Sequence, residues 1–210
     1  DNPDHPMVAI LGGAKVSDKL GTIRALSDSA DHLLIGGAMS YTFLKALGRD
    51  VGTSRVEEDR LDTAESLYED AKGRIVLPSD HVVAEALDED ADASVVGEDI
   101  PDDLMGLDIG PETVETYREA LSEAETIVWN GPMGVFEIEQ FSKGTMAVAE
   151  AVADATDDGA FSVVGGGDSV SALSRSGFTD RISHVSTGGG AMLTFLEGAP
   201  LPGIEALSDA

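Results

Sequence analysis

Residues 7–19, with the sequence MVAILGGAKVSDK, decide the fold that this chain predicts. Five apolar residues come first, two glycines follow, and then Leu20, Ile23 and Leu26 recur at helical spacing. An apolar run without alternation is typical of a strand buried on both faces, and such strands belong to parallel sheets covered by helices. The stretch therefore predicts a strand, a glycine turn and a helix of an α/β protein.

The same arrangement recurs along the chain. Apolar runs predict further strands at residues 32–35, 75–77, 126–129, 161–164 and 184–187. Their alternation with helices indicates a doubly wound, Rossmann-like parallel sheet with helices on both faces, a three-layer α/β/α fold. Residues 80–111 are less regular and predict a side hairpin built on residues 82–83 and 95–96. We expect residues 1–210 to form a single domain.

The composition excludes several classes of protein. The 210 residues contain no cysteine, which rules out disulfide frameworks, thiol catalysis and thiolate metal sites. No apolar run approaches the roughly 18 residues of a membrane span, and no signal peptide is recognisable at the start. We therefore expect a cytoplasmic protein.

The charge is strongly negative. Forty Asp and Glu against 13 Lys and Arg give a formal net charge of -27. Such a surface repels nucleic acids and anionic lipids, so we expect neither as a partner. The acidic residues are spread over the whole chain, a pattern that favours a halophilic, salt-adapted protein over a merely acidic one.

The glycine-rich turns point to a phosphate-bearing ligand. Glycine lets backbone approach a ligand closely, and the helix that follows offers free N–H groups and a partial positive charge. One such turn is ordinary in α/β proteins, but four after apolar strands favour an anion- or nucleotide-binding edge. Neither G-x-x-x-x-G-K-[ST] nor G-x-G-x-x-G occurs, which argues against ordinary P-loop and dinucleotide folds.

A few charged residues stand beside these turns. Lys15 and Lys19 follow the first turn at four-residue spacing, which predicts one shared helix face directed at an anion; the alternative is a pair of surface lysines. Asp168 follows the glycines of residues 165–167 and either caps a helix or engages Mg²⁺ on nucleotide phosphates. Glu137 is placed to accept hydrogen bonds from ribose hydroxyls.

Read together and in order, the turns resemble the C-terminal, nucleotide-binding domain of phosphoglycerate kinases. The resemblance covers essentially the whole chain. It is carried by LGGAKVSDK (11–19), IGGAM (35–39), TFL (42–44), MGLDIGP (105–111), IVWNGPMGVFE (127–137), GGGDS (165–169), HVSTGGGA (184–191) and LPG (201–203). Each block alone is weak evidence, but the blocks occur in register.

The resemblance implies reversible, Mg²⁺-dependent phosphoryl transfer between 1,3-bisphosphoglycerate and ADP, giving 3-phosphoglycerate and ATP in glycolysis and gluconeogenesis. It implies that Lys15 grips the transferring phosphoryl group, which the backbone N–H groups of Gly188, Gly189 and Gly190 also contact. Lys19 would hold the nucleotide phosphates, and Glu137 the ribose.

The other implied nucleotide-binding residues form two groups. The adenine slot would be walled by Gly13, Ala14, Gly36, Gly37, Gly106 and Leu107, with Asn130, Gly131, Pro132 and Met133 nearby. At the phosphates, the resemblance places Gly166, Gly167 and Ser169, with Asp168 engaging Mg²⁺. Ser169 stands where the family often has threonine, so the hydroxyl is retained.

The resemblance also implies that only half of the enzyme is present. In the family, a separate N-terminal domain holds the phosphoglycerate on a basic patch, so we expect residues 1–210 to bind Mg-ADP or Mg-ATP as a monomer without appreciable turnover. A stand-alone nucleotide-binding module without transferase activity and a non-enzymatic acidic protein remain the alternatives. The length and charge of the parent reading frame distinguish the first, and a nucleotide titration the second.

Overall fold

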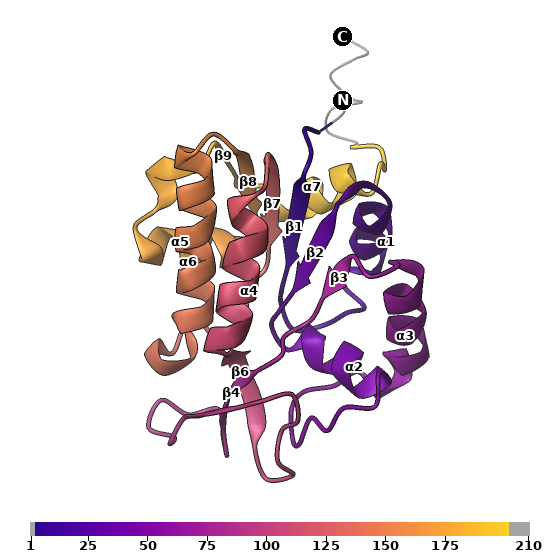
Figure 1. Cartoon of the computed structure of the whole chain (residues 1–210), viewed down its shortest axis with the longest axis vertical. Helices are drawn as coiled ribbons and strands as arrows, with labels where there is room; N and C mark the ends of the chain where they lie inside the picture. The colour runs from indigo at the N-terminus through magenta and orange to yellow at the C-terminus, as the bar shows by residue number, and fades with distance from the viewer. Residues whose placement is uncertain (1–2, 202–210) are drawn as a thin grey trace.

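The computed structural model describes residues 3–201, and its centre is a six-stranded parallel sheet (Figure 1). The strands lie in the order β3-β2-β1-β7-β8-β9. Their bounds are β1 (Met7–Leu11), β2 (His32–Ile35), β3 (Ile75–Val76), β7 (Thr126–Asn130), β8 (Phe161–Gly165) and β9 (His184–Ser186). Counted along the chain, this is the 3-2-1-4-5-6 order of a Rossmann sheet. The predicted doubly wound α/β fold is confirmed.

Helices cover both faces of this sheet (Figure 1). One layer contains α1 (Leu20–Ser29), α2 (Met39–Ala46), α3 (Leu61–Asp70) and α7 (Gly189–Leu196). The other layer contains α4 (Pro111–Ser122), α5 (Lys143–Asp157) and α6 (Gly167–Ser176). Short 3₁₀ turns lie at η1 (Glu58–Arg60), η2 (Glu139–Phe141) and η3 (Thr179–Arg181).

The two cores explain why the strands are apolar throughout. In β1, Val8 and Ile10 pack with Trp129 in the core under α4 and α5. Met7, Ala9 and Leu11 alternate with them and face the opposite core, which contains Ile23 of α1 and Phe43 of α2. Because each face of the strand meets its own helix layer, neither set of positions tolerates polar side chains.

A second, three-stranded antiparallel sheet lies below the carboxyl ends of the parallel strands (Figure 1). It consists of β4 (His81–Ala84), β5 (Ser94–Val96) and β6 (Met105–Ile109), in the order β5-β4-β6. The predicted side hairpin is confirmed, because Val82 pairs with Val95. Strand β6 was not predicted, since Gly106 and Asp108 interrupt its apolar pattern.

The segment after β1 differs from the prediction. Helix α1 begins only at Leu20, so Lys15 and Lys19 do not share a helix face, and that prediction is wrong. The segment is held as a loop by distant parts of the chain, because Val16 is buried in the core and the Ser17 hydroxyl donates to the Glu57 carboxylate at 2.5 Å. Tertiary contacts therefore override the helical spacing.

Two further outcomes concern the extent of the fold. Among residues 3–201, no helix combines the length and apolar character that a bilayer crossing needs. The single domain predicted for residues 1–210 includes residues 1–2 and 202–210, which lie outside the described part, as does most of the 201–203 block. That domain assignment stays a prediction.

Candidate functional site

The glycine turns meet at the carboxyl edge of the sheet, where the strand order reverses between β1 and β7. The Gly12 amide donates to the Asn130 carbonyl at 3.0 Å, and the Gly13 amide donates to the Pro132 carbonyl at 3.2 Å. The Gly37 amide, in the turn after β2, donates to the Met133 carbonyl at 2.8 Å. In open α/β sheets, ligands bind in the crevice at this switch point.

Two pairs of turns touch so closely that only glycine fits. Gly37 has φ 66°, and a Cβ atom on it would lie 2.5 Å from the Gly13 amide nitrogen. A Cβ atom on Gly189 would lie 2.6 Å from the Cα of Gly166, so the turns after β8 and β9 also meet. The glycines therefore allow the turns after neighbouring strands, called corners below, to lie in contact. These corners have no side chains at the contact, so they present backbone atoms.

A cavity of about 330 Å³ opens between these corners and the small sheet. Nine of the predicted site residues line it: Gly13, Ala14, Gly37, Gly106, Leu107, Pro132, Met133, Glu137 and Asp168. Gly36 does not, because it is buried directly against the Met133 side chain. The other predicted residues at the edge of the sheet also lie outside the lining: Lys15, Lys19, Asn130, Gly131, Gly166, Gly167, Ser169 and Gly188–Gly190.

Lys19 lies beneath the glycine corners and connects the corner after β1 with the end of β7. Its Cε atom would lie 3.6 Å from a Cβ on Gly13, and its ammonium group donates to the Asn130 backbone carbonyl at 3.4 Å and to the Asn130 side-chain oxygen. Lys19 is only 9% exposed. Burial lowers the pKa of its ammonium group to about 8, although Asp18 and Asp168 raise it in part. A buried cation held this way suits an anionic ligand.

The N-terminus of α6 stands beside this lysine. Gly166, with φ 101°, precedes the helix, and the exposed Asp168 lies in its first turn. The Ser169 hydroxyl is buried and accepts the Gly131 amide at 2.5 Å, so its side chain supports the turn after β7 and is not free to reach outward. What α6 offers a ligand is therefore its backbone N–H groups and the Asp168 carboxylate.

The cavity also contains residues that sequence reasoning missed. They are Ala38, Tyr41, Thr53, Arg55, Leu87, Met105, Gly134, Val135 and Phe136. Five of them, Ala38, Met105, Gly134, Val135 and Phe136, lie inside the sequence blocks that carry the family resemblance, so membership of a block was an available signal. Arg55 had a different signal, its rarity as a basic residue in an acidic chain, but nothing local indicates that it reaches the cavity.

Comparison with known proteins identifies the family. The protein-family model described as Phosphoglycerate kinase matches residues 1–199. The chain belongs to this family. It is 77% identical over 210 residues to the phosphoglycerate kinase of Salinibacter ruber (strain DSM 13855 / M31), covering all of this chain and 53% of that protein. It is 55% identical to that of Lactobacillus delbrueckii subsp. lactis, covering 99% of this chain and 51% of the relative.

Solved structures agree with this assignment. Phosphoglycerate kinase from Coxiella burnetii has a TM-score of 0.93 at 47% identity, and the similarity covers 100% of this chain and 54% of that one. The enzyme from Pyrococcus horikoshii OT3 has a TM-score of 0.84 at 37% identity, covering 98% and 52%. This chain therefore spans about half the length of the phosphoglycerate kinases it matches.

The residues that the phosphoglycerate kinase resemblance assigns to the transferring group lie toward the open side of the site. Lys15 is exposed on the loop after β1. Gly188 precedes α7, and a Cβ atom on Gly190 would meet open space. These groups are accessible to a ligand, whereas Lys19 and Asn130 are buried supports. The two lysines are therefore close in sequence but differ in exposure: Lys15 is open to solvent, and Lys19 is buried.

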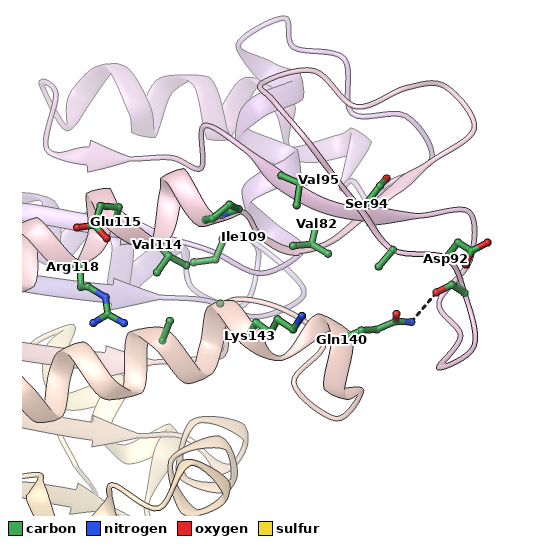
Figure 2. Close-up of a pocket in the computed structure, with 15 residues that line it drawn as sticks. Val82, Asp92, Ser94, Val95, Ile109, Val114, Glu115, Arg118, Gln140 and Lys143 are labelled. Carbon is green, nitrogen blue, oxygen red and sulfur yellow. Dashed lines mark hydrogen bonds between the residues drawn. The ribbon is translucent and has the colours of Figure 1, made fainter.

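A larger cavity of about 1050 Å³ lies elsewhere in the chain, between the β4–β5 hairpin and helices α4 and α5 (Figure 2). Two of its polar side chains serve the fold itself: Arg118 pairs with Glu150 at 2.8 Å, and the Gln140 amide donates to three carbonyls of residues 88–91. No predicted site residue lines it. We therefore place the site at the smaller cavity.

Proposed function

We propose that this chain is the nucleotide-binding, C-terminal half of a phosphoglycerate kinase that transfers a phosphoryl group reversibly between 1,3-bisphosphoglycerate and Mg-ADP. The observation that carries the proposal is the cavity at the sheet's switch point, which places backbone corners, Asp168 and the α6 N-terminus together. Family membership supports the reaction. The part of the relatives outside the match is where we place the phosphoglycerate-binding half.

The nucleotide would lie across the carboxyl edge. Its base enters the slot between Gly37 and Leu107, and its ribose hydroxyls donate to the exposed Glu137 carboxylate at the rim. Its phosphates then run toward α6, where the N–H groups of residues 166–169 point outward from the helix start. Lys19 adds positive charge from below. This path uses the cavity lining at one end and the helix dipole at the other.

Mg²⁺ fits this site as part of the nucleotide complex. Among the described residues, no group of three or more His, Asp or Glu side chains could hold a metal ion by itself. Asp168 supplies one carboxylate beside the phosphate path, which matches the preference of Mg²⁺ for one or two carboxylates plus phosphate oxygens. When bound, the ion neutralises charge on the phosphates. Asp168 would orient that complex over the α6 N-terminus.

In phosphoryl transfer the protein positions the reactants and neutralises their charge, and no covalent nucleophile is needed. Lys15, exposed at the open side, would contact the transferring phosphoryl group, and Gly188, Gly189 and Gly190 would offer it N–H donors at the start of α7. Holding the acceptor in line is worth roughly 7–11 kcal/mol of the barrier. We expect the 210 residues to bind nucleotide but to transfer little without the phosphoglycerate-binding half.

Three environmental features belong to the same proposal. The net charge of -27 supports a salt-adapted protein, because screening at high salt removes repulsion between carboxylates. The proposal also includes a monomeric state, which the family resemblance implies, and a cytoplasmic location, which is the expectation from the sequence. None of these features changes the reaction.

Calorimetric titration of the 210-residue chain with Mg-ADP at molar salt tests the binding half of the proposal. We expect saturable binding that Asp168→Asn weakens and that Asp180→Asn, on the exposed turn η3, leaves unchanged. A coupled assay with both substrates tests the other half, and we expect no appreciable turnover. Absence of nucleotide binding by the intact chain refutes the proposal. Turnover comparable to a full-length kinase refutes the division of labour between halves.

A further inference from the structure

The loop between β1 and α1 carries both lysines of the proposed site, but the two are held in different ways. Lys19 is buried and donates to the backbone and side-chain oxygens of Asn130, so direct contacts fix its ammonium group. Lys15 is exposed. The position of its ammonium group therefore depends on the conformation of the loop backbone around it.

A carboxylate from a distant part of the chain holds this backbone. The Ser17 amide donates to one carboxylate oxygen of Glu57 at 3.1 Å, and the Ser17 hydroxyl donates to the other at 2.5 Å. Partial burial raises the pKa of Glu57, but hydrogen bonds from Ser17 and Val16 and the charge of Lys15 together bring it below its usual range. Glu57 is therefore ionised at neutral pH, and hydrogen bonds to an ionised acceptor are about twice as strong as neutral ones.

Glu57 is itself fixed by buried groups. Its amide donates to the hydroxyl of Thr42 at 3.1 Å, and Thr42 is buried in α2. Three residues before Glu57, the buried Ser54 hydroxyl accepts the Gly106 amide at 2.8 Å. Gly106 lines the cavity that we assign to the base, called the base slot below. Residues 54–57 therefore connect the wall of the base slot to the loop that carries Lys15.

We propose that Glu57 is a positioning residue for phosphoryl transfer, which holds the loop so that Lys15 meets the transferring phosphoryl group. The inference rests on the proposed function, which assigns Lys15 to that group. Ser17 lies only two residues after Lys15, so losing its two hydrogen bonds frees the exposed part of the loop. A displacement of about 1 Å in a positioned group can reduce a rate about 100-fold.

The effect should fall on turnover and not on nucleotide binding. Lys15 contacts the group in transfer, and an interaction made mainly in the transition state changes kcat while leaving ground-state binding intact. The ADP phosphates are assigned to Lys19 and the α6 N-terminus. Because Asn130 holds Lys19 independently of Glu57, that part of the site should survive the loss of the Glu57 carboxylate.

Steady-state kinetics of the complete kinase, this chain together with its phosphoglycerate-binding half, test the inference. Glu57→Ala should lower kcat about tenfold or more and change the KM for Mg-ADP less than about twofold. Ser17→Ala removes the hydroxyl donor and should lower kcat in the same direction, and the double variant should be no slower than Glu57→Ala alone. Glu58→Ala is the matched control. It removes an adjacent, exposed carboxylate that pairs with Lys45 at 2.6 Å, and it should leave kcat unchanged.

A conservative variant separates hydrogen bonding from charge. In Glu57→Gln, the side-chain oxygen can accept the Ser17 amide and the NH₂ group can donate to the Ser17 hydroxyl, so most of the turnover should return. Hydrogen exchange of the 210-residue chain gives a second readout. The Ser17 amide should exchange faster in Glu57→Ala than in the wild type or in Glu58→Ala, with ADP affinity retained.

The outcomes separate this inference from the proposed function. An unchanged kcat in Glu57→Ala overturns it, because the burial of Val16 alone would then fix the loop. Equal losses of turnover and ADP affinity also overturn it, since they assign Glu57 to the stability of the fold. A Glu57→Gln variant as slow as Glu57→Ala overturns it in favour of a charge effect on Lys15. No turnover by the wild-type complete kinase refutes the proposed function instead.

Discussion

Nucleotide binding should be coupled to proton uptake at Lys19. This side chain is 9% exposed, and its burial beneath the glycine corners lowers its pKa to about 8, against 10.5 for a lysine in water. A diphosphate at the α6 N-terminus favours the charged ammonium form and raises that pKa again. Where Lys19 is partly neutral, the chain must therefore take up a proton when ADP binds.

The magnitude follows from the pKa. With a value near 8, about one tenth of Lys19 is neutral at pH 7, about half at pH 8 and about nine tenths at pH 9. Proton uptake per bound ADP should rise through the same fractions. Because only the charged form holds the phosphates well, ADP affinity should fall about tenfold between pH 7 and pH 9, equivalent to about 1.4 kcal/mol.

Calorimetric titrations at pH 7, 8 and 9 in buffers of different protonation enthalpy measure this uptake directly. Lys19→Gln should bind ADP more weakly and remove the pH-dependent uptake. Lys15→Gln is the matched control: Lys15 is exposed on the same loop and is assigned to the transferring group, so its loss should leave both ADP affinity and proton uptake intact. Uptake that persists in Lys19→Gln, or affinity that is flat from pH 7 to 9, refutes the reasoning.

Three further predictions concern stability. Burial lowers the pKa of His81 to about 4, so the stability that its neutral form contributes to the free energy of unfolding is present above pH 6.5 and is lost, by about 3 kcal/mol, as the pH falls toward 4. Denaturant titrations of His81→Leu should lack this acid slope, and those of the exposed His184→Leu should retain it. Burial raises the pKa of Asp108 to about 8, so the stability that its protonated form contributes to the free energy of unfolding is present below about pH 4 and is lost as the pH rises to 8. Asp108→Asn should flatten the dependence of the free energy of unfolding on pH over this range; an unaltered slope would contradict the raised pKa of Asp108. Finally, at a net charge of -27, lowering KCl from 1 M to 0.01 M lengthens the screening distance from about 3 Å to about 30 Å, and the melting temperature should fall steeply; a constant midpoint would show that surface repulsion does not control stability.

Local sequence was sufficient for the parallel sheet. The six apolar runs became β1, β2, β3, β7, β8 and β9, because a strand buried on both faces must be apolar at every position, and that requirement is visible in the chain itself. The glycine turns were also readable, since the carboxyl ends of parallel strands meet at one edge whatever the details of packing. Most of the nine predicted residues around one cavity came instead from the family resemblance, since Gly106 and Leu107 lie on β6, which the apolar pattern did not predict.

Only the tertiary structure decided the properties of individual side chains. Helical spacing at Lys15 and Lys19 was misleading because Val16 and Ser17 are held by the core and by Glu57, forty residues from Ser17. The burial that lowers the pKa of Lys19 comes from corners that lie up to 111 residues away. Arg55 likewise reaches the base slot because Ser54 bonds to Gly106. A strand's apolar run is a local property, whereas burial, pKa and a place in a cavity depend on which distant segments surround a residue.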